Sequence, residues 1–196
     1  EKKGMITIMS KEVKVTPMDT VNNARTMPWK VAIEPFRVAP RVWYVGNTWV
    51  GSFLIQTSEG LALIDTTVME DLYLLIDSIH RLGFDPKDLK HIFLTHAHMD
   101  HDGAARALKE LTGAKVWLSR EDEEWRHRPE ADVSDTGFAI VPYETDCFYE
   151  DETPIVMGDV VIRTRLSAGH TPGTTSFFVE MKDEEGKTVV WGMHGG

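Results

Sequence analysis

The stretch from Thr95 to Gly103 constrains this chain most, because it reads Thr-His-Ala-His-Met-Asp-His-Asp-Gly and holds three imidazoles and two carboxylates. A short apolar run at 91–95 precedes it and predicts a buried strand. Apolar residues at helical spacing in 103–111 follow it and predict a helix. The cluster therefore lies on a strand-to-helix loop, where open α/β sheets hold their functional groups.

The side chains of this cluster indicate a metal site, because neutral imidazole nitrogen and carboxylate oxygen are ligands that zinc accepts. His96 and His98 converge only if the loop turns around a shared centre, while Asp100 and His101 begin the next helix. This arrangement differs from the helical His-Glu-x-x-His pair, whose histidines share one helix face. Histidines at a strand end can instead cap backbone groups, but so many ligand types together favour a bound metal.

A second histidine motif follows a predicted strand at 160–166 and reads Ser-Ala-Gly-His-Thr-Pro-Gly in 167–173. His170 precedes the turn formers Pro172 and Gly173, so its ring can point across the sheet edge toward the first cluster. Alone, it would be a structural turn residue. Beside the first cluster, it is predicted to complete a three-histidine zinc site.

The remaining pattern predicts an α/β fold, because strands alternate with helices along the middle of the chain. Residues 1–30 show no clear period and are expected to form an irregular leading segment, and 129–154 a long surface segment near the site. Ser119 offers a side-chain cap to a short acidic helix that reaches Arg126. The other predicted elements are a β-meander over 42–45, 52–57 and 61–65, a helix over 68–82, a strand at 115–118, and a hairpin from 174–181 and 187–191.

Composition excludes several classes of function. A net charge of −10 argues against a nucleic-acid surface, and no apolar run approaches the length of a membrane span. The acidic runs at 121–124, 150–152 and 183–185 are interpreted as solvated faces and turns. The single Cys147 excludes an intrachain disulfide. No leader is visible, and the compartment and oligomeric state are left open. The expected partner is a small-molecule substrate, with no nucleic acid and no membrane.

The two histidine motifs together resemble the metallo-β-lactamase superfamily. His-Ala-His-Met-Asp-His is followed by Ala-Gly-His-Thr-Pro-Gly-Thr-Thr-Ser-Phe, and the match is closer to the true metallo-β-lactamases that carry His after the motif aspartate. The resemblance extends from about residue 28 to 191. Further segments that look like this subclass are 35–38, 43–46, 61–65 and 85–89.

This resemblance implies an αβ/βα sandwich with one or two zinc ions, formed by a metal-binding domain at 31–196 whose C-terminal portion is missing. His96, His98 and His170 would hold the first zinc, and Asp100 and His101 would contribute to the second. Asp65 looks like the buried aspartate that steadies the ligand loop, although a solvated turn residue is the alternative. His194 is either a replacement ligand or a plain loop histidine. The family resemblance alone also implies a periplasmic or secreted location.

The expected chemistry is hydrolysis of a carbonyl-carbon bond by a metal-bound hydroxide, because zinc lowers the pKa of bound water toward about 7. Asp100 is the predicted catalytic residue, orienting the hydroxide. A β-lactam amide is the leading substrate, which would make the chain an antibiotic-resistance enzyme. The alternatives are a thioesterase or lactonase like glyoxalase II on the same fold, and a metal-binding domain without turnover.

Overall fold

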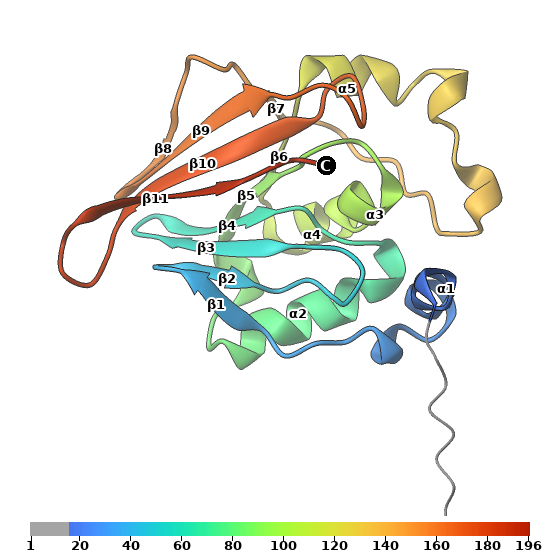
Figure 1. The fold of residues 1–196 in the computed structure, drawn as a ribbon, viewed down its shortest axis with the longest axis horizontal. Coiled ribbons are helices and arrows are strands. Elements are labelled where there is room, and N and C mark those ends of the chain that lie inside the picture. The colour runs from blue at the N-terminus through green and yellow to red at the C-terminus, as the bar shows by residue number, and fades with distance from the viewer. Residues whose placement is uncertain (1–15) are drawn as a thin grey trace, which may run out of the picture.

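The computed structural model describes residues 16–196, which form two facing β-sheets with helices packed outside the larger one (Figure 1). The larger sheet has seven strands in the order β1 to β7, and the smaller has four in the order β11-β10-β9-β8. The strands of the larger sheet are β1 (Phe36–Ala39), β2 (Val42–Tyr44), β3 (Phe53–Thr57), β4 (Gly60–Ile64), β5 (Leu89–Phe93), β6 (Lys115–Leu118) and β7 (Cys147–Phe148). Those of the smaller sheet are β8 (Ile155–Met157), β9 (Val160–Leu166), β10 (Thr175–Lys182) and β11 (Thr188–Met193).

The larger sheet confirms the predicted meander and crossovers. Strands β1 to β4 pair antiparallel, and β4 to β7 pair parallel. Parallel neighbours need a long return connection, which α2 (Leu72–Arg81) and α4 (Ala105–Thr112) provide. The carboxyl ends of β4, β5 and β6 therefore meet at one edge of the sheet, and the loop that leaves β5 carries four of the candidate ligands.

Two apolar clusters hold these layers together. On one face of the larger sheet, Leu75 and Ile79 of α2 and Leu108 of α4 pack against Leu63 and Ile92. The helical stripe predicted over 68–82 is therefore correct, with its first turn a 3₁₀ helix, η2 (Met69–Asp71). On the other face, the sheets pack on each other through buried side chains that include Ile64, Phe93, Ile162, Phe177 and Val179.

The α/β fold class is confirmed, and residues 16–196 show one helix layer and both sheets of the expected αβ/βα sandwich. The predicted strand at 160–166 and the hairpin after it are also correct. The outward face of the smaller sheet carries the exposed apolar side chains Val156, Phe178 and Val190. Among residues 16–196, no helix has the length and hydropathy required to cross a membrane.

The prediction for the leading segment is wrong in part, because residues 17–26 form the helix α1 (Pro17–Thr26). A capping box starts this helix: the Thr16 side chain accepts from the Asp19 backbone N–H, and the Asp19 carboxylate accepts from the Thr16 backbone N–H. The helix buries only Ala24, so its weak apolar period gave no signal. Residues 1–15 lie outside the described part of the chain.

The acidic helix and the long segment after it border the ligand loops. Helix α5 (Arg120–Trp125) is capped by Ser119 as predicted. The segment 129–154 contains the 3₁₀ turns η4 (Pro129–Ala131) and η5 (Ser134–Thr136) and then β7. The other short elements are η1 (Pro28–Lys30), η3 (Pro86–Asp88) and α3 (Met99–Asp102).

Candidate metal centre

Two loops bring the predicted ligands together. The first leaves β5 after Phe93, runs through His96 and His98, and enters α3, which carries Asp100 and His101. The second joins β9 to β10 and carries His170. A backbone hydrogen bond of 2.8 Å from Thr175 N to Thr95 O joins the bases of the two loops. Residues that are more than seventy positions apart in sequence are thus neighbours in space.

His96 lies at the bottom of the site, and its ring is fully buried. The Thr95 hydroxyl donates its single hydrogen to Asp65 Oδ2 (2.8 Å), so its contact with His96 Nδ1 (2.9 Å) must be donated by the imidazole. This fixes the proton on Nδ1 and leaves a lone pair on Nε2. That buried Nε2 has no hydrogen-bond partner within the described residues. An unpartnered buried nitrogen of this kind is costly unless it binds a ligand.

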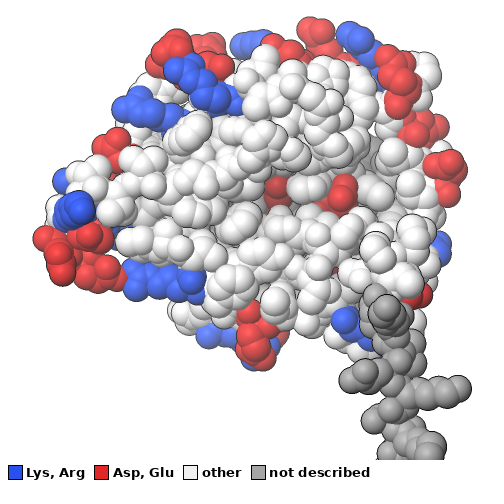
Figure 2. Space-filling view, viewed as in Figure 1, with Lys and Arg blue, Asp and Glu red and all other residues white. Residues whose placement is uncertain are grey.

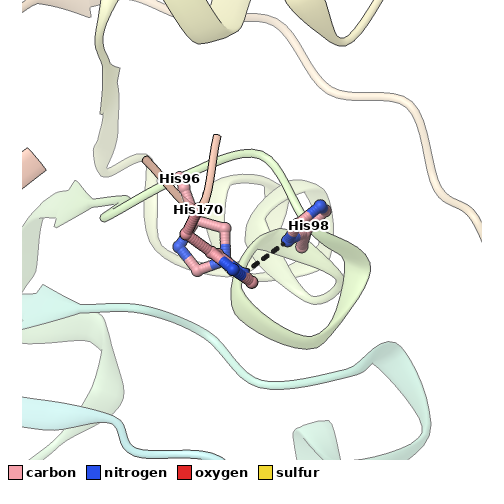
Figure 3. A group of neighbouring side chains, drawn as sticks. All are labelled: His96, His98 and His170. Atoms are coloured by element: carbon pink, nitrogen blue, oxygen red, sulfur yellow. Dashed lines mark hydrogen bonds between the residues drawn. The ribbon is translucent and has the colours of Figure 1, made fainter. Parts of the chain in front are cut away.

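His98 and His170 surround the same point. Figure 3 shows the His98 and His170 rings beside His96, with the 3.0 Å contact from His98 Nδ1 to His170 Nε2 as a dashed line. One nitrogen from each of the three rings lies within 4.8 Å of the others. Ligand nitrogens about 3.3 Å apart are expected around tetrahedral zinc with bonds of about 2.0–2.1 Å. The three rings therefore fit a zinc ion.

A second group joins His96 with Asp100 and His101, whose ligand atoms also lie within 4.8 Å of one another. Asp100 and His101 are each about one-fifth exposed, with 3.7 Å between Asp100 Oδ2 and His101 Nε2. His101 Nδ1 lies 2.8 Å from Asp65 Oδ2 and is the donor to that carboxylate. The structure therefore brings all five predicted ligands into two overlapping groups.

Asp65 lies directly beneath the first loop and is 1% exposed, so the solvated-turn alternative does not describe it. Its carboxylate accepts hydrogen bonds from the Thr95 backbone N–H, the Thr95 hydroxyl and His101. Its backbone is in the left-handed region, with φ of 61°, which Asp tolerates better than most residues. The aspartate is thus placed to orient both ends of the ligand loop.

The electrostatics of the site suit a cation. Burial, together with the neighbouring His101, His98 and His170, lowers the pKa of His96 to about 2, and burial and His170 lower the pKa of His98. Burial also lowers the pKa of His101, but Asp65, Asp100 and Asp102 outweigh it and leave that pKa raised. Figure 2 shows carboxylates in a central hollow and Lys and Arg at the rim of this face.

His194 is not brought to either group within the described residues. Its side chain is exposed, and its Nδ1 accepts a 3.2 Å hydrogen bond from Gly196 N. The plain loop histidine is therefore the alternative that matches this geometry. The role of His194 as a replacement ligand stays a prediction, tested below by substitution.

A cavity of about 210 Å³ lies between the ligand loop and the segment 129–154, which was expected to lie near the site. Ala97, Met99 and Tyr143 line it, and the Tyr143 hydroxyl donates a 3.0 Å hydrogen bond to Asp102 Oδ2. Burial raises the pKa of Asp102 to about 7. This contact anchors the long segment beside the helix that carries Asp100.

Sequence reasoning missed the residues behind the ligands. Asp122 was interpreted as part of a solvated acidic run, yet it is fully buried and accepts hydrogen bonds from both ligand loops. This interpretation is wrong because one face of α5 packs on those loops while Glu121 and Glu124 face solvent. Trp125, on the same helix, packs edge to face on His98 with 5.3 Å between ring centroids. The one sequence signal for Trp125 was its position as the last residue of a capped helix.

Comparison with known proteins identifies the family. A sequence model of the metallo-beta-lactamase superfamily matches residues 50–192, which contain both ligand loops. The chain belongs to the metallo-beta-lactamase superfamily. The resemblance drawn from the two histidine motifs is therefore confirmed.

Solved members of the superfamily share the fold. BJP-1, a subclass B3 metallo-beta-lactamase of Bradyrhizobium japonicum, superposes with a TM-score of 0.78 at 28% identity, over 87% of this chain and 65% of that one. The metallo-beta-lactamase GOB-18 from Elizabethkingia meningoseptica gives 0.75 at 33% identity, over 85% of this chain and 63% of that one.

Curated relatives within the superfamily include enzymes with another substrate. The N-acyl homoserine lactonase AttM of Agrobacterium fabrum is 28% identical over 121 residues, which are 56% of this chain and 43% of that protein. The probable metallo-hydrolase YqgX of Bacillus subtilis is 26% identical over 133 residues, 59% of this chain and 63% of that protein. The chain thus spans less than two thirds of the length of these relatives.

Proposed function

We propose that this chain is a zinc-dependent hydrolase that opens the amide of a β-lactam ring. The observation that carries the proposal is the convergence of His96, His98 and His170 around a buried nitrogen without a partner. The similarity to B3 metallo-beta-lactamases over 85–87% of the chain supports the lactam as substrate. With that substrate, a role in antibiotic resistance and a periplasmic or secreted location become parts of the same proposal.

His96, His98 and His170 would hold the first zinc, and Asp100 and His101 would contribute to a second. Zinc supplies Lewis-acid polarisation of a carbonyl and lowers the pKa of water from about 15.7 toward about 7. The lowered pKa values of His96 and His98 keep both rings neutral near pH 7, as ligation requires. Asp65 holds His101 in one tautomer by accepting the proton of its Nδ1.

Asp100 is the residue to which we assign proton handling. Its carboxylate is about one-fifth exposed at the start of α3, so it can accept a hydrogen bond from a water molecule that approaches the site. In hydrolysis the water oxygen bonds to the carbonyl carbon, the carbon–nitrogen bond breaks, and the ring nitrogen gains a proton. A carboxylate that orients the attacking water contributes to such a step by positioning and proton transfer.

Lactone hydrolysis is the second candidate, favoured by the lactonases among the curated relatives. An ester carbonyl needs the same nucleophile and the same polarisation as an amide carbonyl. A thioesterase of the glyoxalase II type is the other form of the second candidate. The third candidate, a metal-binding domain without turnover, would bind zinc but hydrolyse none of these substrates. Parallel assays with a chromogenic cephalosporin, an N-acyl homoserine lactone and a glutathione thioester separate these candidates.

The test uses His96→Ala and His170→Ala beside the unchanged protein. We expect turnover of the chromogenic cephalosporin by the zinc-loaded protein to fall at least 100-fold in both variants, because each loses a ligand of the first zinc. His80→Ala, at an exposed position on α2, is the matched control and should keep full turnover. His194→Ala should behave like this control if His194 is a plain loop residue.

Three results would contradict the proposal. Unchanged turnover in both ligand variants would remove the metal centre from the reaction. Turnover of the lactone with none of the cephalosporin would replace the lactam by the second candidate. Stoichiometric zinc binding without turnover of any of the three substrates would leave the domain as a metal-binding module.

A further inference from the structure

The buried carboxylate of Asp122 contacts both ligand loops at once. Its Oδ2 accepts from the Ala97 backbone N–H and from the Thr171 hydroxyl, each at 2.8 Å. Its Oδ1 accepts from the Gly173 backbone N–H at 2.7 Å. Ala97 lies between two predicted ligands of the first loop, and Thr171 follows the predicted ligand His170 of the second.

The position of this carboxylate is itself fixed. Asp122 is fully buried on α5, and its backbone N–H donates a 3.1 Å hydrogen bond to the Ser119 side chain, which caps that helix. The second loop approaches so closely that a Cβ on Gly173 would lie 2.0 Å from Ser119 Oγ and 2.7 Å from Asp122 Cβ. A glycine is therefore required for the loop to reach α5.

We infer that Asp122 is a positioning residue that sets the distance between the two ligand loops, and thereby the affinity of the three-histidine site for zinc. The inference rests on the metal centre of the proposed function. The backbone hydrogen bond from Thr175 to Thr95 joins the loops at their bases, whereas Asp122 joins them next to the ligands themselves. Without it, the loops would be joined by the base contact and by the direct contact between the His98 and His170 rings, and no hydrogen bond from α5 would hold them in place.

Both oxygens of the side chain matter because all its contacts are with donors. A carboxylate offers two acceptor oxygens, while an asparagine amide offers one acceptor and one NH₂ donor. In Asp122→Asn, either Gly173 N–H or the pair formed by Ala97 N–H and the Thr171 hydroxyl must face that NH₂. The backbone N–H of either Ala97 or Gly173 therefore loses its hydrogen bond to α5, although the volume of the side chain is nearly unchanged.

The test measures zinc affinity by chelator competition and the absorption spectrum of the cobalt-substituted protein. We expect Asp122→Asn to weaken binding of the first zinc by about 10–100-fold, the usual effect of losing a residue that orients ligands. The cobalt spectrum should also change, because the histidines no longer meet at the same geometry. Asp122→Glu, which keeps two acceptor oxygens, should recover part of the affinity.

Two control variants make the test specific. Glu121→Gln removes one carboxylate charge from an exposed position of the same helix and should leave zinc affinity unchanged. Leu75→Ala removes buried side-chain volume from α2, on the helix-covered face of the larger sheet, and lowers stability while leaving the hydrogen bonds between α5 and the ligand loops in place. It should leave the affinity and the cobalt spectrum of the folded protein as they are.

The outcomes separate this inference from the proposed function. Equal zinc affinity in Asp122→Asn and the unchanged protein would overturn the positioning role while keeping the metal centre. An equal loss in Leu75→Ala would also overturn it, because general destabilisation would then explain the effect. Failure of the unchanged protein to bind zinc would refute the proposed function itself. If Asp122→Asn does not fold, Thr171→Val takes its place in the test, because it removes one of the three donors to Asp122. It should weaken zinc binding, and equal zinc affinity in Thr171→Val and the unchanged protein would overturn the inference.

Discussion

Asp71 provides a test of the electrostatics away from the metal ligands. Its carboxylate is 1% exposed; Oδ2 accepts a 2.6 Å hydrogen bond from Asn47 Nδ2, and Oδ1 has no partner among the described residues. Burial, with a contribution from the negative charge of Glu70, raises its pKa from 3.8 to about 7, against the hydrogen bond from Asn47. The folded protein therefore holds a proton that the unfolded chain releases.

The sign of the effect follows from this difference. Because the folded pKa is the higher one, the stability from this proton is complete below pH 3.8 and is lost as the pH rises through about 7. A pKa that rises from 3.8 to about 7 corresponds to about 4 kcal/mol, of which roughly 2.5 kcal/mol disappears between pH 5 and 8. Asp71→Asn, which cannot ionise, does not lose this stability.

The assay is urea unfolding of the metal-free protein at pH 5 and pH 8, with chelator present because metal binding has a pH dependence of its own. The stability of Asp71→Asn relative to the unchanged protein should rise by roughly 2.5 kcal/mol from pH 5 to pH 8. Any fixed cost of the amide cancels in this difference. Asp77→Asn, exposed on α2, makes the same charge change and should show a difference below about 0.5 kcal/mol. If the difference in the free energy of unfolding between Asp71→Asn and the unchanged protein were the same at pH 5 and pH 8, the reasoning would be refuted.

Three further predictions concern stability of the metal-free protein, measured by urea unfolding. Asp65→Asn should cost about 3 kcal/mol, because buried donors of Thr95 and His101 lose a carboxylate partner; a loss below about 0.5 kcal/mol would contradict that role. Leu108→Ala should cost about 2–5 kcal/mol by opening a cavity under α4, and a neutral result would place Leu108 outside the core. Thr16→Ala should cost about 1 kcal/mol through loss of the capping box of α1, whereas no change would mean that α1 does not contribute to stability.

The sequence predicted those parts of the fold whose pattern is local and strong. The apolar stripe of α2, the strand β6 and the β10–β11 hairpin each follow from periodicity and turn residues alone. The leading helix α1 was missed because it buries one residue and so has little apolar period. The available signal was its capping box, formed by Thr16 and, three residues later, Asp19.

The candidate site was predictable where several ligand types stand together in sequence, as they do from His96 to His101. The residues that hold those ligands were not, because their partners come from distant parts of the chain. Asp122 meets Ala97 and Thr171 across 25 and 49 positions. A carboxylate on a short acidic helix has the same local pattern whether it faces solvent or a buried loop, and only the packing of α5 decides between the two.

The central claim is that one divalent ion is bound jointly by two loops that are distant in sequence. Anomalous scattering at the zinc edge, from crystals of this chain soaked in a zinc salt, tests it most directly. We predict a peak within about 2.0–2.1 Å of one nitrogen each of His96, His98 and His170. Absence of a peak there, with the three rings pointing apart, would contradict the account.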